Sequence, residues 1–205
     1  MKKINLLLVL GVLSVLFITS CEPEDPIIPN EEEVITTLNF TLTPDGGGTP
    51  VIFTFQDLDG DGGNPPTIIG GTLDTNAIYT GTLELLNESE SPAEDITEEV
   101  QEEAEEHQFF FQTSASGLNI AYDDMDVNGN PIGLSTIVTT KGAITGTITV
   151  TLRHEPNKGA NGVSTGDITN AGGETDIELT FNVEVPILTL TLVFIPLPIP
   201  TLCIF

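Results

Sequence analysis

The sequence predicts an all-β fold, an antiparallel β-sandwich with one short acidic helix. From residue 34 to residue 185, apolar and polar residues alternate with period two, which is typical of strands that bury one face. Turn residues separate these runs at short intervals, and no long amphipathic pattern lies between them. Such strands pair as antiparallel neighbours, so we expect two packed sheets of the immunoglobulin-like kind. A stretch of about 150 residues is enough for one such core.

Each predicted strand is defined by apolar residues that share one face of the sheet. These inward-facing residues are, in chain order, Leu38, Phe40 and Leu42; Val51, Phe53 and Phe55; Tyr79, Leu83 and Leu85; Phe109 and Phe111; Leu118, Ile120 and Tyr122; Ile148, Val150 and Leu152; and Ile177, Leu179, Phe181 and Val183. In the last two strands they alternate with threonines and with acidic or amide residues, which would face solvent. Val185 completes the last strand.

One segment, residues 91–106, has helical periodicity. Its apolar residues recur at three- and four-residue spacing: Ala93, Ile96, Val100 and Ala104. Ten acidic residues fall between positions 88 and 106, so like charges repel along the helix, and packing or bound cations must offset that repulsion. In the next strand Phe110 points opposite to its two neighbours, and we expect Ile96 and Val100 to cover it on the outer face of the sheet.

The N-terminal residues predict an export signal. Two lysines precede an apolar segment, residues 4–18, that is too short for a good transmembrane helix, so residues 1–20 form a predicted signal peptide. The stretch Ile18-Thr19-Ser20-Cys21 resembles the bacterial lipobox, which implies a diacylglycerol group on Cys21 and cleavage before it. An ordinary secretory signal with an incidental cysteine is the alternative. Residues 21–33 are acidic and rich in proline, and predict a solvated tether between lipid and domain.

The tether also bears on localisation. An acidic stretch after the lipid-bearing cysteine is similar to the export signals of surface lipoproteins in some Gram-negative bacteria, which implies the outer membrane. In enteric-type sorting an acidic second residue favours retention at the inner membrane instead. We expect an outer-membrane lipoprotein. The sequence does not decide between the cell surface and the periplasmic face of that membrane.

The charge balance is strongly acidic: 31 Asp and Glu against 5 Lys and Arg give a net charge of −26. Such a chain repels nucleic acid and anionic lipid and attracts cations. We therefore expect no nucleic-acid partner, and membrane contact through the N-terminal lipid; a protein or glycan partner stays open. The two cysteines are Cys21 and Cys203, so no disulfide framework is predicted.

Residues 186–205 differ from the rest of the chain, because they hold four prolines and no charged residue. The prolines leave about ten uninterrupted apolar residues where roughly twenty are needed to cross a bilayer. Two explanations stay open. The segment is either an end that is not native to the chain, or an extra strand or apolar contact segment.

Two acidic loops have oxygen-bearing side chains at alternate positions. The first loop holds Asp57, Asp59 and Asp61, and the second holds Asp124, Asp126 and Asn128. Each resembles the D-x-D-x-[DN]-G part of EF-hand and related calcium loops, which implies Ca²⁺ held by hard oxygen ligands. Both loops lack the bidentate Glu at position twelve, so a simple polar turn is the alternative interpretation.

The two histidines, His107 and His154, face inward just beyond the ends of two predicted strands. If those strands are antiparallel neighbours, the two imidazoles meet at one rim of the sandwich, close to acidic residues 105, 106 and 155. Imidazoles with carboxylates form a transition-metal ligand set. The alternative is that each histidine only forms local hydrogen bonds.

Three segments of the chain carry a family resemblance. Residues 105–111, 152–158 and 170–176, with the sequences EEHQFFF, LRHEPNK and NAGGETD, resemble those of a group of short lipoproteins from flavobacteria-like bacteria. Some members carry a label of the type 1 periplasmic binding fold, which implies repeated βαβ units in two lobes, whereas the period-two alternation predicts a sandwich. The resemblance implies a cell-envelope lipoprotein and no particular activity.

Two functions from different classes follow. The first is a lipid-anchored, non-enzymatic β-sandwich of the cell envelope that binds a ligand or has a structural role, braced by Ca²⁺. The second is a metal-handling protein or small metalloenzyme that uses His107 and His154. The domain has no thiol and no phosphate-binding glycine loop ahead of a helix, so we expect the first function and no enzymatic activity.

Overall fold

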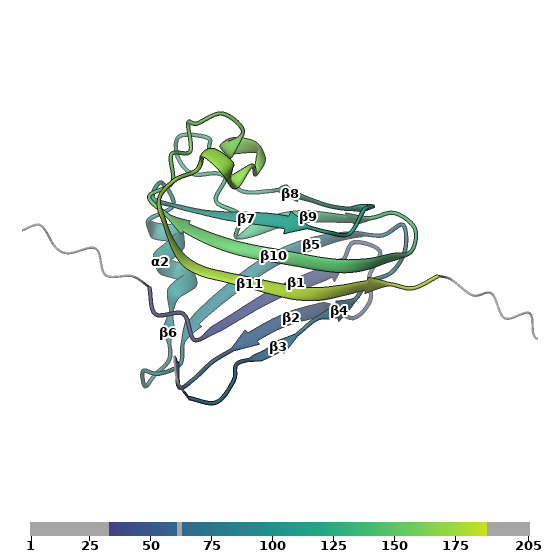
Figure 1. Ribbon diagram of the computed structural model, residues 1–205, viewed down its shortest axis with the longest axis horizontal. Coiled ribbons are helices and arrows are strands. Elements are labelled where there is room, and N and C mark those ends of the chain that lie inside the picture. Colours follow the sequence, from purple (N-terminus) through teal and green to yellow (C-terminus); the bar gives the residue numbers. More distant parts are fainter. Residues whose placement is uncertain (1–32, 61–62, 188–205) are drawn as a thin grey trace, which may run out of the picture. The chain divides into compact units, whose positions relative to one another are not determined.

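The computed structural model describes residues 33–60 and 63–187, which form two β-sheets with one short α-helix (Figure 1). The strands are β1 (Thr37–Pro44), β2 (Val51–Gln56), β3 (Thr67–Ile69), β4 (Gly71–Thr72), β5 (Ile78–Asn87), β6 (Glu94–Asp95), β7 (His107–Thr113), β8 (Leu118–Tyr122), β9 (Ser135–Thr140), β10 (Ile144–His154) and β11 (Glu174–Val185). The helices are α2 (Ile96–Glu102) and the 3-10 turns η1 (Val163–Thr165) and η2 (Ile168–Asn170).

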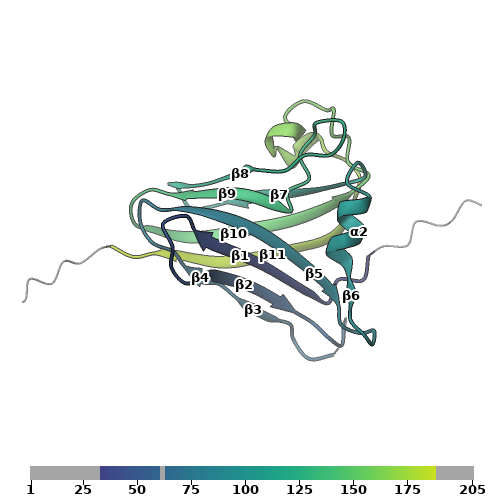
Figure 2. The same cartoon turned by 180° about the vertical axis from the view of Figure 1, so that it is seen from behind.

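The larger sheet has the strand order β3-β2-β1-β5-β9-β8, with β6 beside β5, and the smaller has the order β4-β11-β10-β7. Figure 1 shows the smaller sheet in front and Figure 2 shows the larger one from behind. All pairs are antiparallel except β4 with β11. The predicted all-β sandwich is therefore confirmed, with one short parallel pair added.

The core lies between the inner faces of the two sheets. Phe53 of β2 meets Phe181 of β11 edge to face, with ring centroids 5.9 Å apart, and Phe40 of β1 meets Phe111 of β7 at 5.5 Å. Three of these four rings are fully buried. Aromatic pairs of this geometry add to the area they bury, so they hold one sheet against the other. The period-two alternation predicted these inward positions correctly.

The acidic helix forms, but it packs elsewhere than expected. Asp95 caps its N-terminus by accepting a hydrogen bond from the Thr97 amide. The Thr97 hydroxyl in turn bonds the backbone of Leu85 in β5. This attachment places Ile96 and Val100 in the core between the sheets. The expectation that they cover Phe110 is wrong, because α2 is attached to β5 of the larger sheet, whereas Phe110 belongs to β7 of the smaller sheet.

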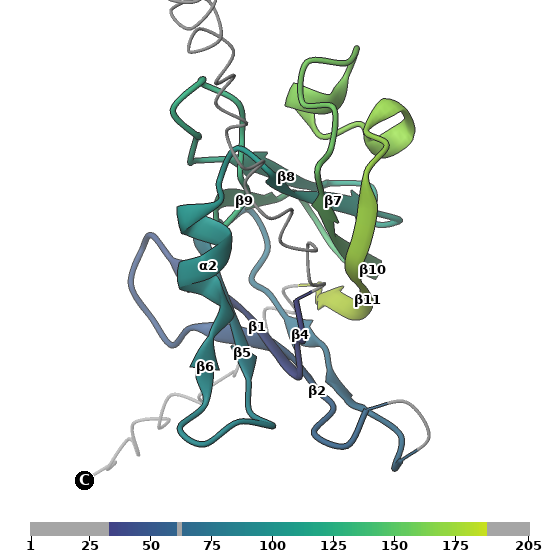
Figure 3. The ribbon, with the colours of Figure 1, turned by 90° about the vertical axis from the view of Figure 1, so that its left-hand side faces the viewer.

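Phe110 is instead covered by the segment that contains η1 and η2. It is fully buried with Val163 and Ala171 in a small cluster of its own. Figure 3 shows α2 beside β5 and β6, while η1 and η2 lie on the side of β7. The outward direction predicted for Phe110 is correct, but the residues that cover it are Val163 and Ala171 and not those of the helix.

Several segments predicted from the sequence lie outside residues 33–60 and 63–187. The signal peptide, Cys21, the tether up to residue 32, and residues 188–205 of the C-terminal tail lie outside the described residues. Strand β11 ends at Val185, where the alternation predicts its end. Within residues 33–60 and 63–187, no helix is both long and apolar enough to cross a membrane.

Candidate metal centre

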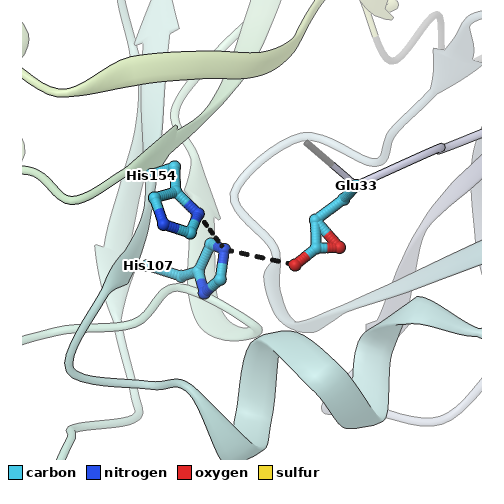
Figure 4. A group of neighbouring side chains, drawn as sticks. All are labelled: Glu33, His107 and His154. Atoms are coloured by element: carbon cyan, nitrogen blue, oxygen red, sulfur yellow. Dashed lines mark hydrogen bonds and ion pairs between the residues drawn. The ribbon is translucent and has the colours of Figure 1, made fainter. Parts of the chain in front are cut away.

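The structure brings His107 and His154 together at one end of the smaller sheet (Figure 4). Strands β7 and β10 are antiparallel neighbours, and His107 lies directly opposite His154 in their register. The two rings are perpendicular, with centroids 4.5 Å apart, and Nδ1 of His154 lies 2.9 Å from Nε2 of His107. The meeting of the two imidazoles follows from strand phase. Their role as metal ligands stays a prediction.

Two carboxylates that the sequence did not indicate complete the cluster. Glu33 Oε1 lies 3.6 Å from His107 Nε2, and Asp176 Oδ2 lies 4.0 Å from the same nitrogen. The side chains of His107, Glu33 and Asp176 are 0%, 8% and 1% exposed, and His154 is 4% exposed. The cluster is therefore almost entirely withdrawn from water.

Asp176 reaches this cluster because of a β-bulge. Leu152 pairs with Ile177, but the next residue, Arg153, pairs with Thr175, so Asp176 is an extra residue in β11. Regular alternation from Ile177 would place Asp176 on the outer face. A bulge breaks the alternation and redirects the side chain, which explains why the sequence pattern could not find this carboxylate.

The hydrogen bonds of the two rings define which nitrogens carry protons. Nδ1 of His107 lies 3.2 Å from the carbonyl oxygen of Glu103. A carbonyl can only accept, so His107 carries its proton on Nδ1 and presents a lone pair on Nε2. His154 must then donate from Nδ1 to that lone pair. A backbone carbonyl that holds the outer nitrogen in this way is the usual support of a metal-ligating histidine.

The electrostatics of the cluster favour a bound cation. Burial, and then the charges of Glu99, Glu103 and Asp176, raise the pKa of Glu33 from 4.5 to about 7. Burial and the neighbouring His154 lower the pKa of His107 from 6.5 to about 4. At neutral pH this imidazole is uncharged, which is the form that binds metal. Glu33 Oε2 is buried without a hydrogen-bond partner, so its lone pairs are unsatisfied.

The separation of Glu33 from His107 suits a shared ion better than a direct hydrogen bond. Ligand atoms of Glu33, His107 and His154 all lie within 4.8 Å of one another. Two ligands at about 2.0–2.2 Å from one ion lie roughly 3 to 4 Å apart. The 3.6 Å between Glu33 and His107 is too long for a hydrogen bond. Two imidazole nitrogens and the Glu33 carboxylate form a set suited to zinc and similar divalent ions, and Asp176 lies close to it.

The first predicted calcium loop uses its carboxylates to shape the turn. Asp57 accepts from the Gly60 amide, and Asp59 accepts from both the backbone and the side chain of Asn64. The Asn64 bonds lower the pKa of Asp59. Asp61 lies outside the described residues. Calcium binding at this loop stays a prediction.

The second loop has a lysine beside its carboxylates. Asp124 and Asp126 both accept hydrogen bonds from backbone amides, and Asp126 also contacts the Lys158 ammonium at 3.1 Å. Asn128 donates its amide to Glu105. Bonds from two loop amides and from Lys158 lower the pKa of Asp126 against the effect of its burial. Calcium stays a prediction here too, and an ammonium already balances Asp126.

Residues 162–166, GVSTG, match the G-x-S-x-G spacing of a nucleophile elbow. An elbow lies on a sharp turn from a strand into a helix, whereas these residues surround the 3-10 turn η1, with Ser164 exposed. The only two histidines of the chain are His107 and His154. Both are buried and bonded to each other, so Ser164 has no imidazole base.

Comparison with known proteins gave no match: no family model, no curated protein and no solved structure matches this chain. The function proposed below therefore depends on the geometry and chemistry of the metal centre.

Replacing Lys158 should destabilise the fold strongly. Its ammonium bonds Asp126 and the carbonyl oxygens of Ala104 and Pro131, and removing one partner leaves a buried charge unpaired, at a cost of about 3–5 kcal/mol. Urea unfolding of Lys158→Ala measures the loss. The exposed Lys141 provides the control, since Lys141→Ala should change stability by about 0.5 kcal/mol at most. Equal stability of the two variants would contradict the buried pairing.

In metal-free protein, Glu33→Gln should raise the melting temperature at pH 8. The pKa of Glu33 is raised from 4.5 to about 7, so the folded state binds this proton more tightly than the unfolded chain does. The carboxylate therefore lowers stability progressively as pH rises from 4.5 towards 7. Glutamine cannot ionise, so the variant does not lose this stability. The difference in melting temperature between the variant and the unaltered chain should vanish near pH 4.5.

Thermal melts in the presence of a chelator, at several pH values, measure this difference. The control is Glu98→Gln, which removes an exposed acidic residue from α2. A Glu33→Gln melting temperature equal to that of the unaltered chain at pH 8 would show that Glu33 is not held in a repulsive site.

Proposed function

We propose that this protein is a non-enzymatic metal-binding module of the cell envelope, with a divalent ion of the zinc class at Glu33, His107, His154 and Asp176. One observation carries the proposal: two imidazoles and the Glu33 carboxylate lie together at ligand spacing, with the buried Asp176 carboxylate 4.0 Å from His107 Nε2. Burying the Glu33 carboxylate, whose Oε2 has no hydrogen-bond partner, is unfavourable without a compensating cation. A divalent ion would neutralise Glu33 and replace the His107–His154 hydrogen bond, with the proton of His154 moving to Nε2 so that Nδ1 can bind the ion.

The position of the four residues supports a structural or storage role for the ion. Glu33 precedes β1 of the larger sheet, whereas the other three side chains come from the adjacent strands β7, β10 and β11 of the smaller sheet. An ion at this point joins the beginning of the domain to the opposite sheet. The low exposure of these side chains leaves little room for a substrate beside the ion, which favours a non-catalytic role.

The N-terminal sequence supports a place in the cell envelope. We propose that Cys21 carries the lipid anchor, because the small residues and the cysteine follow the apolar segment directly. The acidic tether favours the outer membrane, and the net charge of −26 would keep the domain away from anionic lipid while drawing cations towards it. Calcium at the two acidic loops belongs to the same proposal as a secondary brace.

The full chain, purified in detergent if it fractionates with membranes, should bind one equivalent of zinc. At about 100 times the dissociation constant the ion should stabilise the fold by roughly 2.7 kcal/mol. His154→Gln should abolish this gain. Glu33→Gln should lower the melting temperature of the zinc-loaded protein, although it raises that of the metal-free protein, because the charge that repels its neighbours also binds the ion.

Calorimetric titration and thermal melts, run with zinc, manganese and calcium side by side, measure these effects. Glu98→Gln again provides the control and should bind zinc like the unaltered chain. A protein that takes up no transition metal after dialysis against a chelator and reloading would refute the proposed centre. Stabilisation by calcium alone would point to the acidic loops instead.

Cys21→Ser should release the protein from the membrane, because the thioether that carries the lipid can no longer form. Fractionation of cells that express the unaltered chain and the variant measures the change. Cys203→Ser, the other cysteine of the chain, is the matched control and should leave the distribution unaltered. A Cys21→Ser protein that still sediments with the membrane would contradict the lipid anchor.

A further inference from the structure

A second group of metal-ligating side chains shares His154 with the buried centre. A ring nitrogen of His154 and one carboxylate oxygen each from Glu106 and Glu155 lie within 4.8 Å of one another. Both glutamates are exposed, whereas His154 is 4% exposed. This single imidazole therefore belongs to a buried ligand group and to one that faces solvent.

The sheet itself holds the two glutamates side by side. Glu106 comes immediately before β7 and Glu155 immediately after β10, so they extend the His107–His154 pair by one step. The amide of Glu155 donates to the carbonyl oxygen of Glu106 at 2.6 Å. Gly173 packs against the same turn, where a Cβ atom would lie 2.2 Å from the His154 carbonyl oxygen. The backbone of this group is thus fixed by the strand pairing.

The buried centre needs a route by which an ion reaches it. Its four side chains are between 0% and 8% exposed, and a divalent ion arrives with a full shell of water. Carboxylates at the surface can bind such an ion while it keeps most of its water ligands. An ion between Glu106 and Glu155 is already within reach of His154, which can replace further water.

We propose that Glu106 and Glu155 form a loading position, where the hydrated ion is captured and then passed through His154 to the buried centre. This inference rests on the proposed metal-binding function. Both groups use His154, so an ion captured at the two glutamates is one ligand exchange away from the buried centre. A loading position lies on the path in both directions, so it speeds uptake and release equally and leaves the affinity of the buried centre unchanged.

The test is the kinetics of zinc exchange in the full chain. Stopped-flow mixing with zinc, followed by a chromophoric zinc indicator, gives the uptake rate, and transfer of bound zinc to the same indicator in excess gives the release rate. For Glu106→Gln with Glu155→Gln, we expect both rates to fall by about tenfold or more, with an unchanged dissociation constant and one zinc per chain. Metal-free thermal melts check that the variant is folded.

The matched control is Glu98→Gln with Glu102→Gln, which removes the same charge from two exposed residues of α2. It should exchange zinc at close to the unaltered rates, which separates local capture from general attraction of cations. A Glu106/Glu155 variant that loads as fast as this control would overturn the loading position. A weaker affinity with an unchanged uptake rate would overturn it too, because that result describes a ligand of the final site.

The unaltered chain distinguishes this inference from the function it rests on. If it binds no zinc at equilibrium, the buried centre itself is refuted and the loading position with it. If the unaltered chain binds one zinc, the centre stands. If the Glu106/Glu155 variant then exchanges zinc as fast as the Glu98/Glu102 control, the loading position alone is refuted.

Discussion

The register between β7 and β10 is the constraint on which the candidate metal centre depends. Phe109 lies opposite Leu152, and Phe111 opposite Val150, so the same pairing that fills the core also brings His107 opposite His154. A shift of one residue would turn every inward side chain of a strand to the outer face. The aromatic core opposes that shift. The position of the histidine pair is therefore fixed mainly by core packing and only to a small extent by the contacts between the two histidines.

The protein balances its buried carboxylates in two different ways. Asp126 is paired with the ammonium of Lys158, a cation supplied by the chain. Glu33 faces His107, whose pKa is lowered to about 4, so at neutral pH this neighbour has no positive charge to offer. The contrast is one of charge balance within the chain. The carboxylate of Asp126 is balanced by its own ammonium, whereas Glu33 beside the uncharged His107 would gain a counter-charge only from a bound cation.

Strand periodicity predicted the sandwich, the inward faces of its strands and the meeting of the two histidines, because each depends on alternation along a strand. It failed where the backbone departs from regular alternation or where contact depends on tertiary packing. Asp176 enters the cluster because of a β-bulge, which the spacing of residues in the sequence does not predict. Glu33 ends a segment whose prolines and acids predict a solvated tether. Likewise Ile96 and Val100 have the right helical spacing, but only their attachment to β5 decides which apolar residues they meet.

The acidic loops are formed by residues close together in the sequence, whereas the histidine cluster is formed by residues far apart, and only the first kind of site can be seen in the sequence. Closely spaced aspartates are visible in the sequence, yet in the structure those described mostly accept bonds from amides of their own turns. The four residues of the centre are separated by 74, 47 and 22 positions along the chain, and only the sandwich brings them together. One of them, Glu33, ends the predicted tether. An ion held there would therefore tie the first described residue of the domain to the strands of the smaller sheet.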